Sequence, residues 1–335
     1  MMNLQTLEDE LSRPSEADIA FMQRIEGDIL ILGAGGKMGP SLARRARRAA
    51  DAASSSRRII AVSRSISDAF ARQLTMEKVE VVPCDLLDRD QIARLPDSPN
   101  VIFLAGRKFG STDNEPLTWA TNVLVPGLVA ERYRGSRIVA LSSGNVYPLA
   151  AAPATEQTPP APVGEYAQSV LGRERVFEFF SARDATAVTL VRLNYAIDLR
   201  YGVLLDIGRR VWERRPVPLK TGSVNVIWQG DANSMCIRAL ELAASPPRLL
   251  NVTGPDTLQV RWIAGRFGEL FGVEPEWEGV ESPTALLSDS SLACHLLGQP
   301  GVRPEAMIEM TAHWIRGDQP TWNKPTHFEV RDGRF

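Results

Sequence analysis

The chain has 335 residues, enough to bury a substantial core in one large α/β domain or in a main domain with a smaller partner. Its formal net charge of -2, with arginine and acidic residues interspersed, gives no reason to expect a nucleic-acid partner. No apolar stretch approaches the roughly 20 residues that cross a bilayer, and the three widely spaced cysteines predict reduced structural thiols and no metal site.

The first 26 residues contain acidic side chains and lack the apolar centre of a signal peptide. We therefore interpret them as a short N-terminal extension of a cytoplasmic protein.

An apolar run at residues 29–32 leads into Gly33, Gly35, Gly36 and Gly39, and then into a helix-prone segment rich in alanine and arginine. This pattern predicts a strand, a tight turn and a helix start that hold a pyrophosphate, because glycine permits both the turn and a close approach of the backbone. The run of arginines at residues 44–48 predicts a solvated helix face.

Buried-type strands and helices alternate after this turn. Strands are predicted at 59–62, 79–82, 101–104, 137–141 and 187–193, and helices at 67–76, 117–133 and 165–183. Such alternation requires parallel strands with right-handed crossovers, so the fold class is α/β with a doubly wound parallel sheet.

The pattern loosens from about Tyr195 into shorter elements at 216–219 and 223–228, followed by an alanine-rich helix at 232–244. We expect this part to form a smaller lobe that lines a substrate cleft. The predicted units are the extension (1–26), a dinucleotide-binding domain (27–194) and a mostly substrate-binding lobe (195–335) that is partly interleaved with the sheet.

Several segments resemble one known family in order and spacing. They are the G-x-x-G-x-x-G pattern of Gly33, Gly36 and Gly39, then Cys84-Asp85-Leu86, Leu104-Ala105-Gly106, Asn122, residues 142–147 (SSGNVY), Tyr166, residues 251–254 and residues 286–289. Together they resemble the extended short-chain dehydrogenase/reductase family, the NAD-dependent epimerase/dehydratase group, from about residue 28 to 315. The resemblance implies a Rossmann-type sheet with a C-terminal substrate-binding lobe, in which residues 251–254 and 286–289 lie.

The resemblance implies that Tyr166 is the acid/base group and that Ser143 holds the reacting oxygen. A lysine expected one helical turn after the tyrosine is absent, because Val170 occupies that position. A free tyrosine has a pKa of about 10 and is almost fully protonated at neutral pH, so the missing cation matters. Lys108 is the first candidate for a substitute, and Arg173, on the same helical face as Tyr166, is the second.

Three more residues, Asn145, Arg192 and Asn194, are expected to border the cleft, and Asp231 is either a helix N-cap or a functional acid. The residues expected to bind the cofactor are Gly33, Gly36, Lys37, Met38, Gly39, Ser63, Arg64, Asp85, Leu86, Leu104, Ala105, Gly106, Lys108, Asn122 and Tyr166.

The second strand ends in Ser63-Arg64 where NAD-binding relatives carry an acidic residue. A guanidinium can hold a 2′-phosphate that a carboxylate would repel, so NADP is preferred over NAD, with Lys37 adding charge.

The first functional hypothesis is an NAD(P)-dependent oxidoreductase, epimerase or dehydratase acting on a sugar, sugar acid or nucleotide-sugar. The alternative is a catalytically silent NAD(P)-binding sensor or partner-binding protein, which Val170 favours. A third is an enzyme of altered chemistry, such as an elimination. The resemblance also implies a homodimer formed through helices 117–133 and 165–183.

Overall fold

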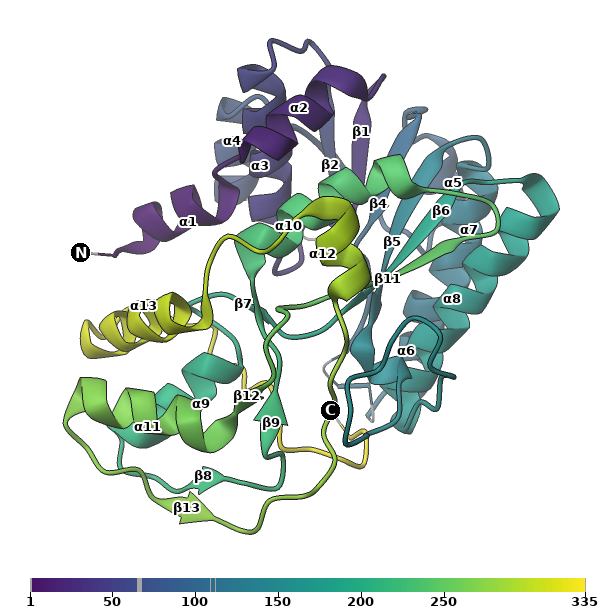
Figure 1. Cartoon of the computed structure of the whole chain (residues 1–335). Coiled ribbons are helices and arrows are strands. Elements are labelled where there is room, and N and C mark those ends of the chain that lie inside the picture. The colour runs from purple at the N-terminus through teal and green to yellow at the C-terminus, as the bar shows by residue number, and fades with distance from the viewer. Residues whose placement is uncertain (1, 65–67, 109, 112, 335) are drawn as a thin grey trace.

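The computed structural model describes residues 2–64, 68–108, 110–111 and 113–334. Its centre is a sheet of seven strands in the order β11-β6-β5-β4-β1-β2-β3, and all neighbouring strands are parallel (Figure 1). The predicted doubly wound sheet is therefore confirmed. The strands are β1 (Ile29–Leu32), β2 (Ile59–Ser63), β3 (Glu80–Pro83), β4 (Asn100–Phe103), β5 (Arg137–Ser143), β6 (Val188–Leu193) and β11 (Arg248–Val252).

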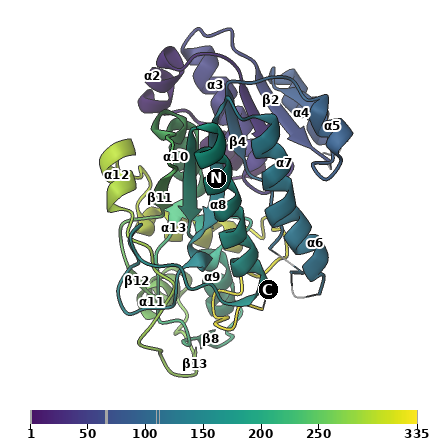
Figure 2. The same ribbon diagram turned by 90° about the vertical axis from the view of Figure 1, so that its right-hand side faces the viewer.

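Alternate residues of each strand enter two different cores, one on each face of the sheet. Ile29 and Ile31 pack beneath α2 (Glu16–Arg24), α3 and α10, whereas Leu30 and Leu32 pack beneath α5, α7 and α8, whose bounds are given below. Figure 2 shows α7 and α8 side by side, and the two helices are in contact. The helices of this part are α3 (Gly39–Ala52), α4 (Asp68–Met76), α5 (Arg89–Ala93), α6 (Glu115–Trp119), α7 (Val125–Arg132), α8 (Gly164–Asp184), α10 (Gln229–Arg238) and α12 (Ser291–Leu297). The predicted start of α4, Ser67, lies outside the described residues.

The helix predicted at 117–133 is interrupted. A π-helical turn, η1 (Ala120–Leu124), separates α6 from α7, and Pro126 stands in the first turn of α7. Because proline has no backbone N–H, Pro126 cannot donate to the carbonyl of Asn122 four residues earlier. That carbonyl is thus available to a side chain of another helix.

The expectation that residues 251–254 belong to the lobe is wrong in part. Residues 248–252 form β11, which pairs with β6 at the edge of the main sheet. Helix α10, which precedes β11 in the chain, packs on α3. Leu250 and Val252 are fully buried in the sheet core, and this burial decides where the strand lies.

The smaller lobe is built around three helices, α9 (Val203–Trp212), α11 (Val260–Phe271) and α13 (Pro304–Arg316), whose core includes Ile207, Phe267 and Trp314. Short strands complete it, β7 (Ala196–Ile197), β8 (Val217–Pro218), β9 (Ser223–Val224), β10 (Ile227–Trp228), β12 (Leu258–Gln259) and β13 (Trp277–Glu278). Two single-turn 3-10 helices are η2 (Gly144–Val146) and η3 (Ala239–Leu242).

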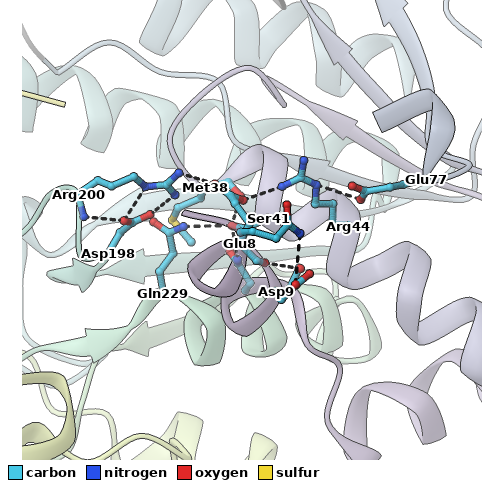
Figure 3. A network of polar contacts seen from close by, with 12 residues as sticks. Glu8, Asp9, Met38, Ser41, Arg44, Glu77, Asp198, Arg200 and Gln229 are labelled. Carbon is cyan, nitrogen blue, oxygen red and sulfur yellow. Dashed lines mark hydrogen bonds and ion pairs between the residues drawn. The ribbon is translucent and has the colours of Figure 1, made fainter. Parts of the chain in front are cut away.

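The N-terminal extension packs against both parts of the molecule. It forms α1 (Leu4–Ser12) and α2 (Glu16–Arg24), and Leu7 and Leu11 of α1 are buried in the core of the lobe. Glu8 pairs with Arg44 of α3 at 2.7 Å and also with Arg200, which precedes α9 (Figure 3).

The prediction that the arginine run of α3 is solvated is wrong. Arg44, Arg45 and Arg47 are only 2%, 5% and 7% exposed, because α1 and α2 cover that face of α3. Acidic groups compensate for the burial, and Arg45 pairs with the fully buried Asp18 at 2.7 Å. None of the helices in the described ranges is long and apolar enough to span a membrane.

Candidate active site

The turn after β1 requires glycine at two positions. Gly33 has a φ of +86°, and a Cβ on it would lie 2.6 Å from the backbone nitrogen of Ala105. A Cβ on Gly39 would lie 2.2 Å from the carbonyl oxygen of Ala34. The turn is therefore packed tightly against the loop after β4 and against itself. It presents bare backbone to a cleft, which is the cradle that a pyrophosphate needs.

Helix α3 begins at this turn without a side-chain cap. Gly39 is its first residue, and the N-cap residue Met38 makes no capping hydrogen bond. The first N–H groups of a helix have no partner within the helix, and they carry the positive end of its dipole. This helix end is thus suited to an anion.

Lys37, from the same turn, points toward the lobe. Its Nζ lies 3.0 Å from the centroid of the Tyr201 ring. Burial, together with the nearby Lys108 and Lys324, lowers the pKa of Lys37 to about 7. The expected role of Lys37 at a 2′-phosphate has no support in this placement, since the side chain lines the central cleft.

Ser63 and Arg64 at the end of β2 line a separate cavity of about 540 Å³. The Arg64 side chain is 65% exposed, and its Nη1 lies 3.4 Å from Oδ2 of Asp85, the residue expected to contact adenine. Leu86 is buried beside them. The residues expected at the adenosine end thus gather at one edge of the sheet.

Asn122 holds the loop after β4 against α8. Its Oδ1 accepts a hydrogen bond from the Arg107 backbone N–H at 2.8 Å, and its Nδ2 donates to the Arg107 carbonyl at 3.0 Å. Nδ2 also donates to Oγ of Ser169 on α8 at 2.9 Å. This places Gly106 and Lys108 at the cleft, with the Lys108 Nζ 5.8 Å from the centroid of the Tyr166 ring. Burial lowers the pKa of Lys108 to about 8.

Ser143 and Tyr166 meet across the cleft. Ser143 ends β5, Tyr166 lies in the first turn of α8, and their hydroxyl groups are hydrogen-bonded to each other. Ser143 Oγ also donates to Oδ1 of Asn145 at 3.0 Å. Burial raises the pKa of Tyr166, while the Ser143 hydrogen bond and the charge of Arg173 act in the opposite direction.

One cleft of about 390 Å³ brings most of the predicted residues together. Its lining includes Gly33, Gly36, Lys37, Met38, Gly39, Leu104, Gly106, Lys108, Ser143, Asn145, Tyr166 and Asn194. Ala105 and Asn122 lie outside the lining, and Ser63, Arg64, Asp85 and Leu86 lie at the sheet edge described above. No carboxylate of the described residues lines the cleft, and no group of described side chains has the composition of a metal site.

Two predicted residues do not reach the cleft. Arg192 is 1% exposed and pairs with the fully buried Glu174 at 2.6 Å, so the expectation that it borders the cleft is wrong. Asp231 lies within the first turn of α10, whose N-cap is Trp228, and it accepts the backbone N–H of Val302 at 3.0 Å. It is therefore neither an N-cap of α10 nor a functional acid in the cleft.

The C-terminal tail, residues 318–334, was not expected near the site. Thr326 lines the cleft, and its N–H and Oγ1 both donate to Oδ2 of Asp206 on α9. Phe328 is 3% exposed in the core of the lobe. The signal in the sequence is the presence of two large aromatic residues, Trp322 and Phe328, in a segment without helix or strand periodicity. Tyr195 and Tyr201 of the lobe also line the cleft and were not predicted.

A family model described as the NAD dependent epimerase/dehydratase family matches residues 29–196. No curated protein sequence matches the chain.

Many solved structures share the fold. MoeE5 in complex with UDP-glucose and NAD is 20% identical, with a TM-score of 0.70 over 87% of this chain and 99% of its own. The UDP-glucuronic acid 4-epimerase from Bacillus cereus, in complex with UDP-glucuronic acid and NAD, is 17% identical with a TM-score of 0.71 and the same two coverages. An epimerase from Methanothermobacter thermautotrophicus is 19% identical, with a TM-score of 0.72 over 90% of this chain and 96% of its own.

Proposed function

Because the chain belongs to the NAD-dependent epimerase/dehydratase family, we propose that it binds NAD(P) and oxidises, epimerises or dehydrates a nucleotide-sugar or a related sugar. The observation that carries the proposal is the hydrogen-bonded pair of Ser143 and Tyr166, which faces the same cleft as the glycine turn.

The charge of the cleft supports a dinucleotide. Lys37, Lys108 and Arg173 line it, and no carboxylate among the described lining residues offsets them. A buried site with excess positive charge is stabilised by an anion. Burial lowers the pKa values of both lysines, and a nearby negative charge would raise them. A pyrophosphate at the glycine turn would supply that anion.

When bound, NAD(P) would supply a hydride acceptor for a carbon of the substrate that carries a hydroxyl. A side chain of the protein must then accept the proton of that hydroxyl. Tyr166 is placed to take it, and Ser143, already hydrogen-bonded to Tyr166, is placed to hold the same oxygen. Asn145 and Asn194 line the cleft beside this pair and are the candidate contacts to the rest of the sugar.

For the cofactor we favour NADP over NAD. Ser63 and Arg64 stand at the end of β2, and the exposed guanidinium of Arg64 can reach a 2′-phosphate. MoeE5 and the Bacillus cereus epimerase are in complex with NAD, so this preference rests on the side chains of this chain.

Two of the similar structures contain UDP-glucose or UDP-glucuronic acid, which makes a nucleotide-sugar the first substrate class to test. A homodimer is proposed through the outer faces of η1 and α8, where Leu124 and Phe179 are 49% and 59% exposed. A cytoplasmic location rests on the sequence alone.

The test begins with titration calorimetry of NAD and NADP, followed by incubation of the complex with UDP-glucose and UDP-glucuronic acid. Products are followed by NMR and by nicotinamide absorbance. We expect turnover, and we expect Tyr166→Phe to lower kcat/KM by about 10²–10⁴ with little change in dinucleotide affinity, because a general base is lost.

Tyr133→Phe is the matched control, since Tyr133 is a buried tyrosine whose hydroxyl donates to the Pro96 carbonyl away from the cleft. Unchanged turnover in Tyr166→Phe would contradict the assigned base. Dinucleotide binding without conversion of any sugar would instead favour a silent NAD(P)-binding sensor.

A further inference from the structure

Val170 lies in a buried, apolar environment, so its position supplies no charge to Tyr166. It stands one helical turn after Tyr166 on α8 but is only 1% exposed. It packs in a small apolar cluster with Val146, Tyr147 and Ala154. Whatever cation acts on Tyr166 must therefore come from elsewhere.

Arg173, two turns after Tyr166 on the same helix, is a buried cation with only neutral hydrogen-bond partners. It is 5% exposed. Its Nη1 donates to the Leu141 carbonyl at 2.6 Å, and its Nη2 donates to Oδ1 of Asn122 at 2.9 Å. The neighbouring Glu174 pairs with Arg192, and no carboxylate of the described residues pairs with Arg173. Burying a guanidinium without a counter-ion is costly, so such a group is retained where its charge is used.

The backbone of the π-helical turn helps to hold this guanidinium. Because Pro126 lacks an N–H, it cannot donate to the carbonyl of Asn122, which accepts a hydrogen bond from Nε of Arg173 at 3.5 Å. Asn122 thus accepts hydrogen bonds from Arg173 at both its backbone carbonyl and its side-chain oxygen. Three nitrogen atoms of one guanidinium are fixed by two residues, so the position of the charge is well defined.

The guanidinium reaches the cleft beside the cofactor turn. Arg173 lines the same cleft as Tyr166 and Gly106, and a Cβ on Gly106 would lie 2.6 Å from Nη2 of Arg173. The guanidinium therefore lies directly against the backbone of Gly106 in the loop after β4. The Cζ atom of Arg173 lies 5.4 Å from the centroid of the Phe103 ring.

We propose that Arg173 is the positioning residue whose fixed positive charge acts on Tyr166, in place of the lysine that Val170 replaces. This inference rests on the proposed role of Tyr166. Among the described residues, the charged or titratable groups that line the cleft with Tyr166 are Arg173 from α8, Lys37 and Lys108 from the loops after β1 and β4, and Tyr195 and Tyr201 from the lobe. Lys108 lies over the Tyr166 ring, whereas Arg173 acts on its ionisation. A guanidinium also keeps its charge through the neutral range, in which Lys108 begins to lose its proton.

The experiment titrates Tyr166 directly in the full chain, without cofactor or substrate. Tyrosine is labelled at Cζ, and its NMR shift is followed with pH. The Tyr166 resonance is assigned by its loss in Tyr166→Phe. Removing an opposite charge near a phenol raises its pKa, so we expect Arg173→Gln to raise the pKa of Tyr166 by about one unit. Arg173→Lys should restore most of the difference.

Two controls separate charge from structure. Arg175→Gln removes an exposed arginine of the same helix that pairs with Glu178, and it should leave the pKa of Tyr166 unchanged. If Arg173→Gln does not fold, Arg173→Met removes the charge with an apolar side chain and carries the same expectation.

An unmoved Tyr166 pKa in a folded neutral variant would overturn the inference, as would a larger shift in Lys108→Met than in Arg173→Gln. A shift measured in a protein without turnover would support this inference and count against the proposed function alone. Turnover that depends on Tyr166, together with an unchanged Tyr166 pKa in Arg173→Gln, would support the proposed function and overturn this inference.

Discussion

Single side chains set the charge at each end of the site. The cations Lys37, Lys108 and Arg173 line the cleft, and no carboxylate of the described lining residues opposes them. At the sheet edge, Arg64 is held loosely beside Asp85 and is otherwise open to solvent. An exposed guanidinium can turn toward a phosphate with little rearrangement. The proposed preference for NADP therefore rests on Arg64.

We expect Arg64→Ala to weaken NADP binding by about 10- to 100-fold, because one charge-assisted hydrogen bond is worth roughly 1.5–3 kcal/mol. NAD binding should change little, since it has no 2′-phosphate. Titration calorimetry with both dinucleotides measures the two dissociation constants.

Arg58→Ala is the matched control. Arg58 is a similarly exposed arginine that precedes the opposite end of β2, where it pairs with Asp28 at 2.8 Å. Equal losses for NADP and NAD in Arg64→Ala would show that Arg64 contacts the shared part of the cofactor and would remove the basis for the NADP preference.

Among the elements, the C-terminal tail most affects access to the cleft. Thr326 binds Asp206, Nη1 of Arg331 donates to the Thr284 carbonyl at 2.6 Å, and Gly333 packs against Gly164 at the start of α8. Where the tail passes Asn145, Tyr147 and Tyr195, a cavity of only about 50 Å³ remains. A nucleotide-sugar is far larger than this space.

Truncation after Asp318 should therefore remove this obstruction and tighten the binding of UDP-glucose. If the tail leaves the cleft in about one to ten per cent of the molecules, the apparent affinity should rise by about 10- to 100-fold. The same truncation should lower the free energy of unfolding by several kcal/mol, of the order of 3–5 for the buried Phe328 alone. Calorimetry and denaturant unfolding measure these effects separately.

Arg334→Ala, a change at an exposed tail residue, should alter neither quantity. Weaker UDP-glucose binding by the truncated chain would mean that the tail contributes contacts to the substrate instead of occupying its space.

At the scale of the whole molecule, the N-terminal extension joins segments that are far apart in the chain. Asp18 of α2 is fully buried, pairs with Arg45 of α3 and accepts a hydrogen bond from Ser234 of α10 at 2.6 Å. Burial would raise the pKa of this carboxyl, but the charge of Arg45 and the hydrogen bonds from Ser234 and Ser15 outweigh it and lower the pKa. The folded state thus stabilises the ionised form of Asp18.

Asp18→Asn should lower the free energy of unfolding at pH 7 by about 3–5 kcal/mol, because it leaves Arg45 buried without its partner. A lowered folded-state pKa contributes stability above the unfolded pKa of about 3.9, and this is lost as pH falls through the folded value. The difference between the two proteins should accordingly shrink in acid. Denaturant unfolding at several pH values measures it.

Asp9→Asn is the control within the same extension. Asp9 is 42% exposed and pairs with Arg48 on the surface, so its loss should cost less than about 1 kcal/mol. Equal losses for the two variants, or an effect of Asp18→Asn that grows in acid, would contradict the account.

The sequence predicted the features that depend on neighbours in the chain. The glycine turn, six strands of the sheet and the helix that carries Tyr166 follow from local sterics and from the periodicity of apolar residues. Ser143 and Tyr166 were named from the resemblance to the family, and they meet because the carboxyl end of β5 and the first turn of α8 border one cleft.

The tertiary structure decided what depends on contacts between distant segments. The burial of Arg44 and Arg45 follows from the extension that covers α3, and the place of β11 follows from pairing with β6 across more than fifty residues. The cation beside Tyr166 was predicted first as Lys108. The position of Arg173 depends on the carbonyl and the side chain of Asn122, in a π-helical turn that meets α8 only in the folded chain. Such an environment has no periodicity in the sequence, because it exists only once the helices have packed.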